Sequence, residues 1–140
     1  MALTYLVDTN IVSEIVKPHV SFQVQQLWNT HQTRMAIASP TWHELVYGVE
    51  RLPDSRRKHG LREFLSNFVL PVLPFDKAAA SWFSQERVRL SRIGRSPAFI
   101  DGQIASVAAA NNLILVTRNV HDFINFQGIT IENWFESEKK

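Results

Sequence analysis

Residues 113–116, Leu-Ile-Leu-Val, form a run in which every position is apolar. A strand with one face in water alternates apolar and polar residues, whereas a strand covered on both faces by helices is apolar throughout. This run therefore predicts a central strand of a parallel sheet. Further short apolar runs lie at 3–7, 35–38, 72–75 and 129–131. Pro74 has no backbone N–H to donate, so we expect 72–75 to lie at a sheet edge or to end early.

Helical patterns lie between these predicted strands. Apolar residues recur three and four positions apart in 42–49 and in 61–68, which is the spacing of one face of a helix. A longer pattern covers 79–93 and ends near Gly94, and the Ala-rich run 97–111 could lie close against a sheet. This alternation predicts an α/β fold, with a mainly parallel sheet of four to five strands flanked by helices on both faces. The sequence has no internal repeat and no long linker, which predicts one domain over 1–140.

The composition disfavours several classes of protein. There is no cysteine, so disulfides, thiolate zinc sites and cysteine nucleophiles are ruled out. The five histidines lack the paired spacing of a zinc site, and there is no Gly-rich nucleotide-binding motif. No apolar run approaches the ~20 residues of a membrane span, and the N-terminus does not resemble a signal peptide. We therefore expect a cytoplasmic protein without a membrane partner.

Polar and acidic residues follow the predicted strands. Asp8 ends the first strand, Glu44 lies one turn into the helix after the second, and Asp101 lies near the start of the Ala-rich helix. Asn119 and Asp122 follow the central strand. Ligands of an open parallel sheet bind beyond the carboxyl ends of its strands, so we expect these five residues to meet there as a catalytic site. Each residue alone has a simpler explanation, as a helix cap or an exposed helix acid, and only their joint placement favours a site.

A divalent cation is the expected partner of such a site. Carboxylates that crowd together raise one another's pKa unless a cation neutralises them. Hard oxygen ligands select Mg²⁺ or Mn²⁺, and Mg²⁺ keeps several waters, so Asp8 and Asp101 suffice as direct ligands. Glu44, Asn119 and Asp122 then bind outer waters or a second ion. A metal held in this way polarises a phosphoryl oxygen and activates a bound water, which predicts hydrolysis of phosphodiester bonds.

The middle of the chain is basic. Residues 51–100 hold ten Lys and Arg against four Asp and Glu, and the acidic candidates all lie outside this segment. A basic surface beside an acidic pocket suits a polyanion such as RNA, although solvated helix faces explain the same charges equally well. We favour RNA contact for Arg92 and Arg95 because they immediately precede the Asp101 segment.

Four motifs occur in the order and with the spacing of a known nuclease family. They are Leu6-Val-Asp8-Thr-Asn10, Thr41-Trp-His-Glu44-Leu45, Phe99-Ile-Asp101 and Leu115-Val-Thr117-Arg-Asn119. Together they resemble the PIN-domain nucleases, and most closely the VapC toxins of bacterial toxin–antitoxin modules. The resemblance spans nearly the whole chain.

The resemblance implies a divalent-metal-dependent ribonuclease with Asp8, Glu44 and Asp101 at its leading acidic positions. It also implies a homodimer, a cognate antitoxin that blocks the site, and structured RNA such as tRNA as the substrate. Many PIN domains have Asp at the position of Asn119, so a second metal would bind weakly here or depend on Asp122.

Three further residues are assigned to substrate binding on the strength of the resemblance. Thr9 and Asn10 would shape the loop after the first strand, and Thr117 matches a threonine that the family carries after its central strand. Two other functions stay open. The Asn119 departure would suit a catalytically weak PIN-like module that only binds RNA or protein. A different Mg²⁺-dependent phosphotransfer enzyme is disfavoured, because the segment 8–10 lacks the second acid of an Asp-x-Asp pair.

Overall fold

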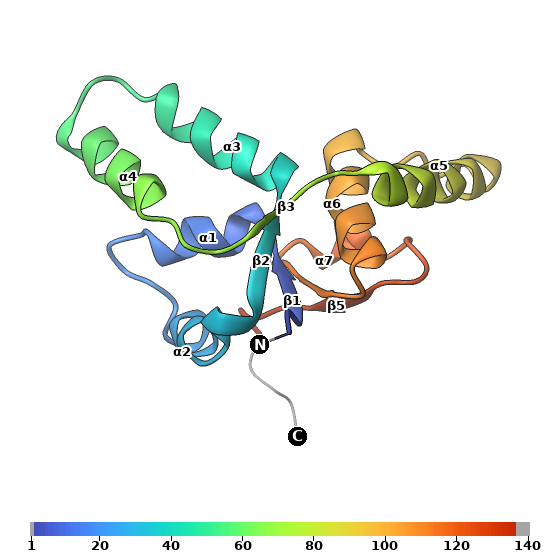
Figure 1. The fold of residues 1–140 in the computed structure, drawn as a ribbon, viewed down its shortest axis with the longest axis horizontal. Coiled ribbons are helices and arrows are strands. Elements are labelled where there is room, and N and C mark those ends of the chain that lie inside the picture. Colours follow the sequence, from blue (N-terminus) through green and yellow to red (C-terminus); the bar gives the residue numbers. More distant parts are fainter. Residues whose placement is uncertain (1, 137–140) are drawn as a thin grey trace.

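Five parallel strands form one sheet in the computed structural model, which describes residues 2–136 (Figure 1). The strands are β1 (Tyr5–Val7), β2 (Met35–Ala38), β3 (Val72–Leu73), β4 (Ile114–Val116) and β5 (Thr130–Glu132). Their order across the sheet is β3-β2-β1-β4-β5, and each neighbouring pair is parallel. The predicted mainly parallel sheet is confirmed. The predicted domain limits, residues 1 and 140, lie outside the described residues.

Helices connect the strands and cover the sheet. They are α1 (Thr9–Ile15), α2 (Phe22–His31), α3 (Ser39–Glu50), α4 (Arg56–Ser66), α5 (Lys77–Arg92), α6 (Phe99–Ala110) and α7 (Val120–Phe123). The four helices predicted from apolar spacing correspond to α3, α4, α5 and α6. Gly94 follows the end of α5 with a φ of 72°, a left-handed conformation that favours glycine and ends the helix as expected.

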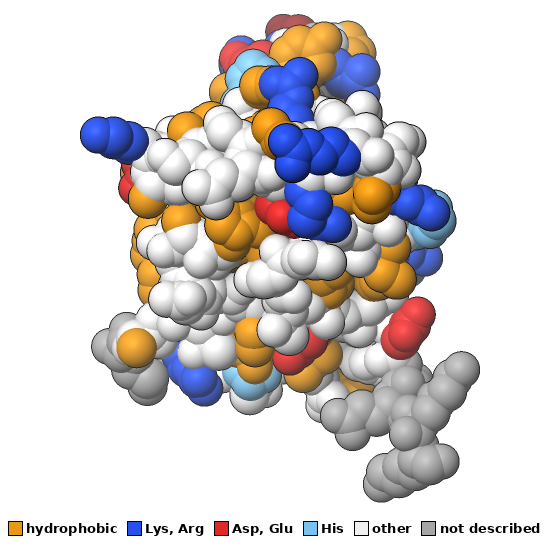
Figure 2. All heavy atoms as spheres, turned by 90° about the vertical axis from the view of Figure 1, so that its right-hand side faces the viewer, with side chains coloured by type: hydrophobic (Ala, Val, Ile, Leu, Met, Phe, Trp, Pro, Cys, Tyr) orange, Lys and Arg blue, Asp and Glu red, His pale blue; other side chains and the backbone are white. Residues whose placement is uncertain are grey.

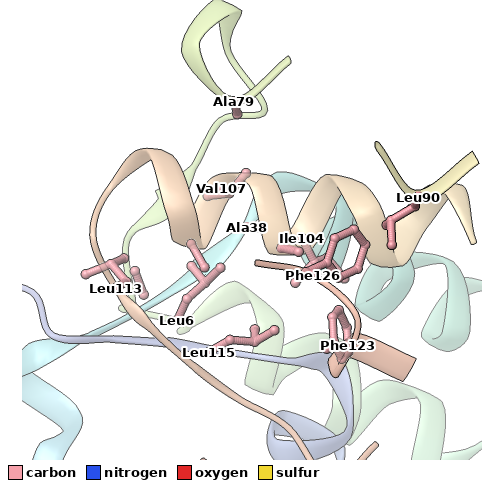
Figure 3. Close-up of a cluster of buried hydrophobic side chains, with 13 residues drawn as sticks. Leu6, Ala38, Ala79, Leu90, Ile104, Val107, Leu113, Leu115, Phe123 and Phe126 are labelled. Carbon is pink, nitrogen blue, oxygen red and sulfur yellow. The ribbon is translucent and has the colours of Figure 1, made fainter. Parts of the chain in front are cut away.

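The two faces of the sheet carry separate hydrophobic cores. In Figure 1, α1 to α4 lie on one side of the sheet and α5 to α7 on the other. Leu6 of β1 and Leu115 of β4 pack towards α6 and α7, as Figure 3 shows, whereas Val7 and Val116 pack in the opposite core with α1 and α2. Because successive strand residues face opposite sides, both faces must be apolar, which explains the unbroken run at 113–116.

The two edges of the sheet are short strands. β3 ends at Leu73, directly before Pro74, and lies at one edge as predicted. β5 forms the other edge. Within residues 2–136, no helix combines the length and apolar character needed to cross a bilayer.

The register of the central strands positions the candidate site. Val7, the last residue of β1, pairs with Val116, the last residue of β4, and the N–H of Asp8 donates to the carbonyl of Val116 at 2.8 Å. Asp8 and Thr117 therefore leave the sheet side by side. The chain moves from β1 to β2 on one side and reaches β4 on the other, so this is the switch point at which parallel sheets bind ligands.

Candidate active site

Asp8 is the most enclosed acid of the site, with 6% of its surface exposed. It caps the N-terminus of α1, where its Oδ1 accepts from the N–H of Thr9 at 2.8 Å. Its Oδ2 accepts from Thr117 Oγ1 at 2.9 Å and from Asn10 Nδ2 at 3.1 Å. Burial raises the pKa of Asp8, these hydrogen bonds oppose the rise, and the charge of Glu44 adds to it. Asp8 therefore both caps α1 and belongs to the candidate site.

Thr117 is fully buried and organises the turn after β4. Its hydroxyl donates to Asp8 and accepts from the N–H of Asn119 at 3.0 Å. Asn10 also donates to it, at 3.4 Å. The structure thus gives Thr117 and Asn10 contacts with Asp8, and contact of either residue with substrate stays a prediction.

Glu44 lies on the exposed side of α3 and faces the same space as Asp8. Its Oε1 accepts a hydrogen bond from Thr9 Oγ1 at 2.9 Å, which joins α3 to the start of α1. The charge of Glu44 raises the pKa of both Asp8 and Asp101. Thr9 therefore contacts two of the predicted acids, one through its backbone and one through its hydroxyl.

Asp101 lies in the first turn of α6 and is partly buried. Its pKa is raised to about 6, first by burial and then by the negative charges of Asp122, Asp8 and Glu44. The charges of Asp8 before α1, Glu44 in α3 and Asp122 in α7 therefore all act on Asp101, whereas a shared catalytic role for these acids stays a prediction.

The turn after β4 supplies the last corner of the site. Asp122 lies in α7, is exposed, and donates from its backbone N–H to the carbonyl of Asn119 at 3.0 Å. Asp122 is the strongest charge acting on the pKa of Asp101, whereas Asn119 has no charge to add. The negative charge at this corner of the site therefore comes from Asp122.

The chemistry of the donor set is the kind that magnesium or manganese prefers, and binding of either ion stays a prediction. Its charged groups are all carboxylates, and the pKa of Asp101 is raised first by burial and then by the neighbouring negative charges, whose repulsion a cation would relieve. Within residues 2–136, no group of three His, Cys, Asp or Glu side chains is close enough to hold a metal unaided. Mg²⁺ commonly binds one or two carboxylates and completes its octahedron with water, so Asp8 and Asp101 match its requirements.

The two arginines predicted to contact RNA lie at the far end of α5. Arg92 is the last residue of that helix, and Arg95 follows Gly94; both are exposed. Figure 2 looks at the side of the molecule to which α5 points, and several Lys and Arg side chains line the upper part of this face. Arg89 forms an ion pair instead, because its Nε and Nη2 donate to the two carboxylate oxygens of Glu86.

An apolar groove runs from the acidic site between α1, α3 and α4. It has a volume of about 790 Å³ and begins at Thr9 and Glu44. Apolar side chains of all three helices line it, including Val12, Leu45, Val49, Leu61, Phe64 and Leu65. The spacing of these side chains in α3 and α4 predicted buried helix faces, and it did not reveal that the two helices leave a groove open between them.

In metal-free buffer, Asp101→Asn should raise the melting temperature more at pH 7.5 than at pH 4.5. The raised pKa means that the folded protein binds the Asp101 proton more tightly than the unfolded chain. The stabilisation from that proton is complete below about pH 3.8, the ordinary pKa of an aspartate, and is lost as the pH rises through about 6. Asn mimics the protonated acid at every pH. Thermal unfolding with EDTA checks this, with Glu63→Gln on the exposed side of α4 as the control; an equal gain at both pH values would contradict it.

Known proteins resemble this chain over most of its length. The chain is 35% identical over 133 residues to a protein from Shigella flexneri named tRNA(fMet)-specific endonuclease VapC, covering 94% of this chain and 98% of that one. It is 29% identical to Toxin FitB from Neisseria gonorrhoeae, covering 94% and 99%. The crystal structure of DNA-bound VapBC from Salmonella typhimurium superposes with a TM-score of 0.80 at 35% identity, covering 94% and 98%.

The family itself follows from the extent of the match. The family model described as PIN domain matches residues 5–127, from the first residue of β1 to beyond α7. Every acid of the candidate site lies within these limits. The chain therefore belongs to the PIN domain family.

Proposed function

We propose that this chain is a divalent-metal-dependent endoribonuclease and the toxin of a toxin–antitoxin pair. The observation that carries the proposal is that the negative charges of Asp122, Asp8 and Glu44 all act on Asp101, whose pKa is raised to about 6 first by burial and then by these charges. The names of the relatives, an endonuclease specific for a tRNA and a toxin, support RNA cleavage as the reaction and tRNA as a candidate substrate. The protein would meet its RNA substrate in the cytoplasm.

Asp8 and Asp101 would hold Mg²⁺ or Mn²⁺. When bound, the ion supplies charge that polarises a phosphoryl oxygen and a water of lowered pKa. Glu44, to which Thr9 Oγ1 donates a hydrogen bond, would orient water around the site. Asp122 adds negative charge on the side of α7, and Asn119 keeps an amide oxygen there. Arg92 and Arg95 would neutralise RNA phosphates beyond the acids.

The apolar groove is the surface best suited to the antitoxin. Its lining includes Thr9 and Glu44, so a chain that fills the groove would also cover Glu44. Its lining of Leu, Val and Phe matches the apolar face of an amphipathic segment. A homodimer, which the family likeness implies, is a separate prediction that light scattering would check by a mass twice that of one chain.

Incubation of the purified protein with total RNA tests the reaction. We expect cleavage with Mg²⁺ or Mn²⁺, loss of cleavage with EDTA, and recovery when Mn²⁺ is added in excess. Sequencing of the new RNA ends identifies the substrate. Binding of RNA without cleavage under any of these conditions would instead favour a binding module. Turnover of small phosphomonoesters without RNA cleavage would favour a phosphotransfer enzyme.

A charge in the groove should separate inhibition from catalysis. Leu61→Asp places a carboxylate among the apolar side chains of the groove, on α4 and away from the acids. We expect unchanged RNA cleavage and an antitoxin affinity at least about tenfold weaker, because a buried unpaired charge is costly. Titration of the cleavage rate with antitoxin measures this. Glu63→Gln, on the same helix, is the control, and full inhibition of Leu61→Asp would show that the antitoxin binds elsewhere.

A further inference from the structure

Asn10 joins the two loops that carry the candidate site. It lies in the first turn of α1, and its amide makes three hydrogen bonds. Nδ2 donates to Asp8 Oδ2 at 3.1 Å and to Thr117 Oγ1 at 3.4 Å. Oδ1 accepts from the backbone N–H of Arg118 at 3.0 Å. Thr117 and Arg118 lie 107 and 108 positions further along the chain, so one side chain connects the exits of β1 and β4.

The partners of Asn10 allow its amide only one orientation. The N–H of Arg118 can only donate, and an ionised Asp8 can only accept. A flipped amide would place its oxygen against the carboxylate and its NH₂ group against a backbone N–H. Aspartate has the shape of Asn but no donor, and Leu has neither donor nor acceptor, so this position requires the amide itself.

These bonds leave the two oxygens of Asp8 unequal. Oδ2 accepts from both Asn10 and Thr117, whereas among residues 2–136 Oδ1 accepts only from the N–H of Thr9. A carboxylate oxygen has about two acceptor positions. Oδ2 is therefore filled, and Oδ1 keeps one position unused.

We propose that Asn10 is a positioning residue with two effects. It fills Oδ2 of Asp8, which leaves Oδ1 as the oxygen that binds a cation, and it holds the loop after β1 against the loop after β4. The effect on the cation rests on the proposed function, whereas the effect on the loops does not. Both N–H groups of the amide serve these contacts, so Asn10 acts through Asp8 instead of through the RNA.

Asn10→Ala and Asn111→Ala form a matched pair for the test. Asn111 Nδ2 donates to the carbonyl of Val107 at 2.8 Å near the end of α6, so its removal costs an Asn hydrogen bond outside the site. We expect both variants to melt at lower temperature than wild type. Only Asn10→Ala should bind Mn²⁺ at least about tenfold more weakly in calorimetry, the usual effect of losing a partner of a metal ligand. Only Asn10→Ala should also speed amide hydrogen exchange at Arg118.

A second variant separates the two effects. Asn10→Asp keeps an acceptor for the Arg118 N–H but sets a second carboxylate against Asp8, so exchange at Arg118 should be slower than in Asn10→Ala and faster than in wild type. Wild-type Mn²⁺ affinity in Asn10→Ala would overturn the effect on the cation and leave the proposed function standing. Wild-type exchange at Arg118 in Asn10→Ala would overturn the effect on the loops. A wild-type protein that neither binds Mn²⁺ nor cleaves RNA would overturn the proposed function and the effect on the cation together.

Discussion

Asp8→Asn is expected to slow RNA cleavage by at least about a hundredfold, because metal-based charge stabilisation is worth several kcal/mol. The substitution removes the negative charge from the most buried acid of the site. It also disturbs the hydrogen bonds, since the donors Thr9, Asn10 and Thr117 approach both oxygens of Asp8. An amide has only one oxygen, so its NH₂ group must face at least one of these donors.

Single-turnover cleavage with excess protein and Mn²⁺ measures this loss. Asp54→Asn is the matched control, because Asp54 is exposed and pairs with His59 outside the site. Its cleavage rate should equal that of wild type. An Asp8→Asn variant that cleaves at the wild-type rate, in a preparation whose activity EDTA abolishes, would remove Asp8 from the metal site.

Gly102→Ala should give the largest loss of stability among the single methyl additions to the chain's helical glycines. Gly102 follows Asp101 in α6, and a Cβ there would lie 2.2 Å from the Cε1 and Cζ atoms of Phe83 in α5. Phe83 is buried and its ring packs against Phe75 and Phe99, so it cannot turn aside freely. Overpacking of this kind costs about 1–3 kcal/mol, which lowers the melting temperature by several degrees.

Gly60→Ala is the matched control for this prediction. Gly60 lies inside α4 with no neighbouring atom within 4 Å of an added Cβ, so Ala should stabilise that helix by about 0.5–1 kcal/mol. Phe83→Leu should recover part of the loss in the Gly102→Ala background, because the smaller side chain gives the methyl room. Thermal unfolding of wild type and the three variants decides the matter, and a Gly102→Ala protein as stable as wild type would show that α5 and α6 can separate without cost.

Local sequence patterns were sufficient to predict the sheet and to place the candidate acids after its strands. An unbroken apolar run can only be covered on both faces, and Pro74 can only end or border a sheet, so β4 and β3 followed from single segments. Asp8 was found because it follows a strand directly. α2 was missed because polar residues interrupt its apolar spacing, and only Val24 of this helix is buried.

Contacts between distant segments could not be predicted in the same way. The bonds of Asn10 and Thr117 to Asp8 depend on the β1–β4 register, which no local pattern contains. The need for glycine at position 102 depends on where the ring of Phe83 lies. The groove between α3 and α4 depends on the angle between two helices whose stripes look alike whether they are buried or open.

The pairing of β1 with β4 also sets the moment in protein synthesis at which the site can form. Asp8 emerges from the ribosome early, but its partner Thr117 and the acid Asp122 belong to segments made more than one hundred residues later. A growing chain therefore carries its first acid without the neighbours that orient it, and β1 has no β4 to pair with. Whatever reaction the finished site performs, a nascent chain cannot perform it on the RNA that surrounds it during its own translation.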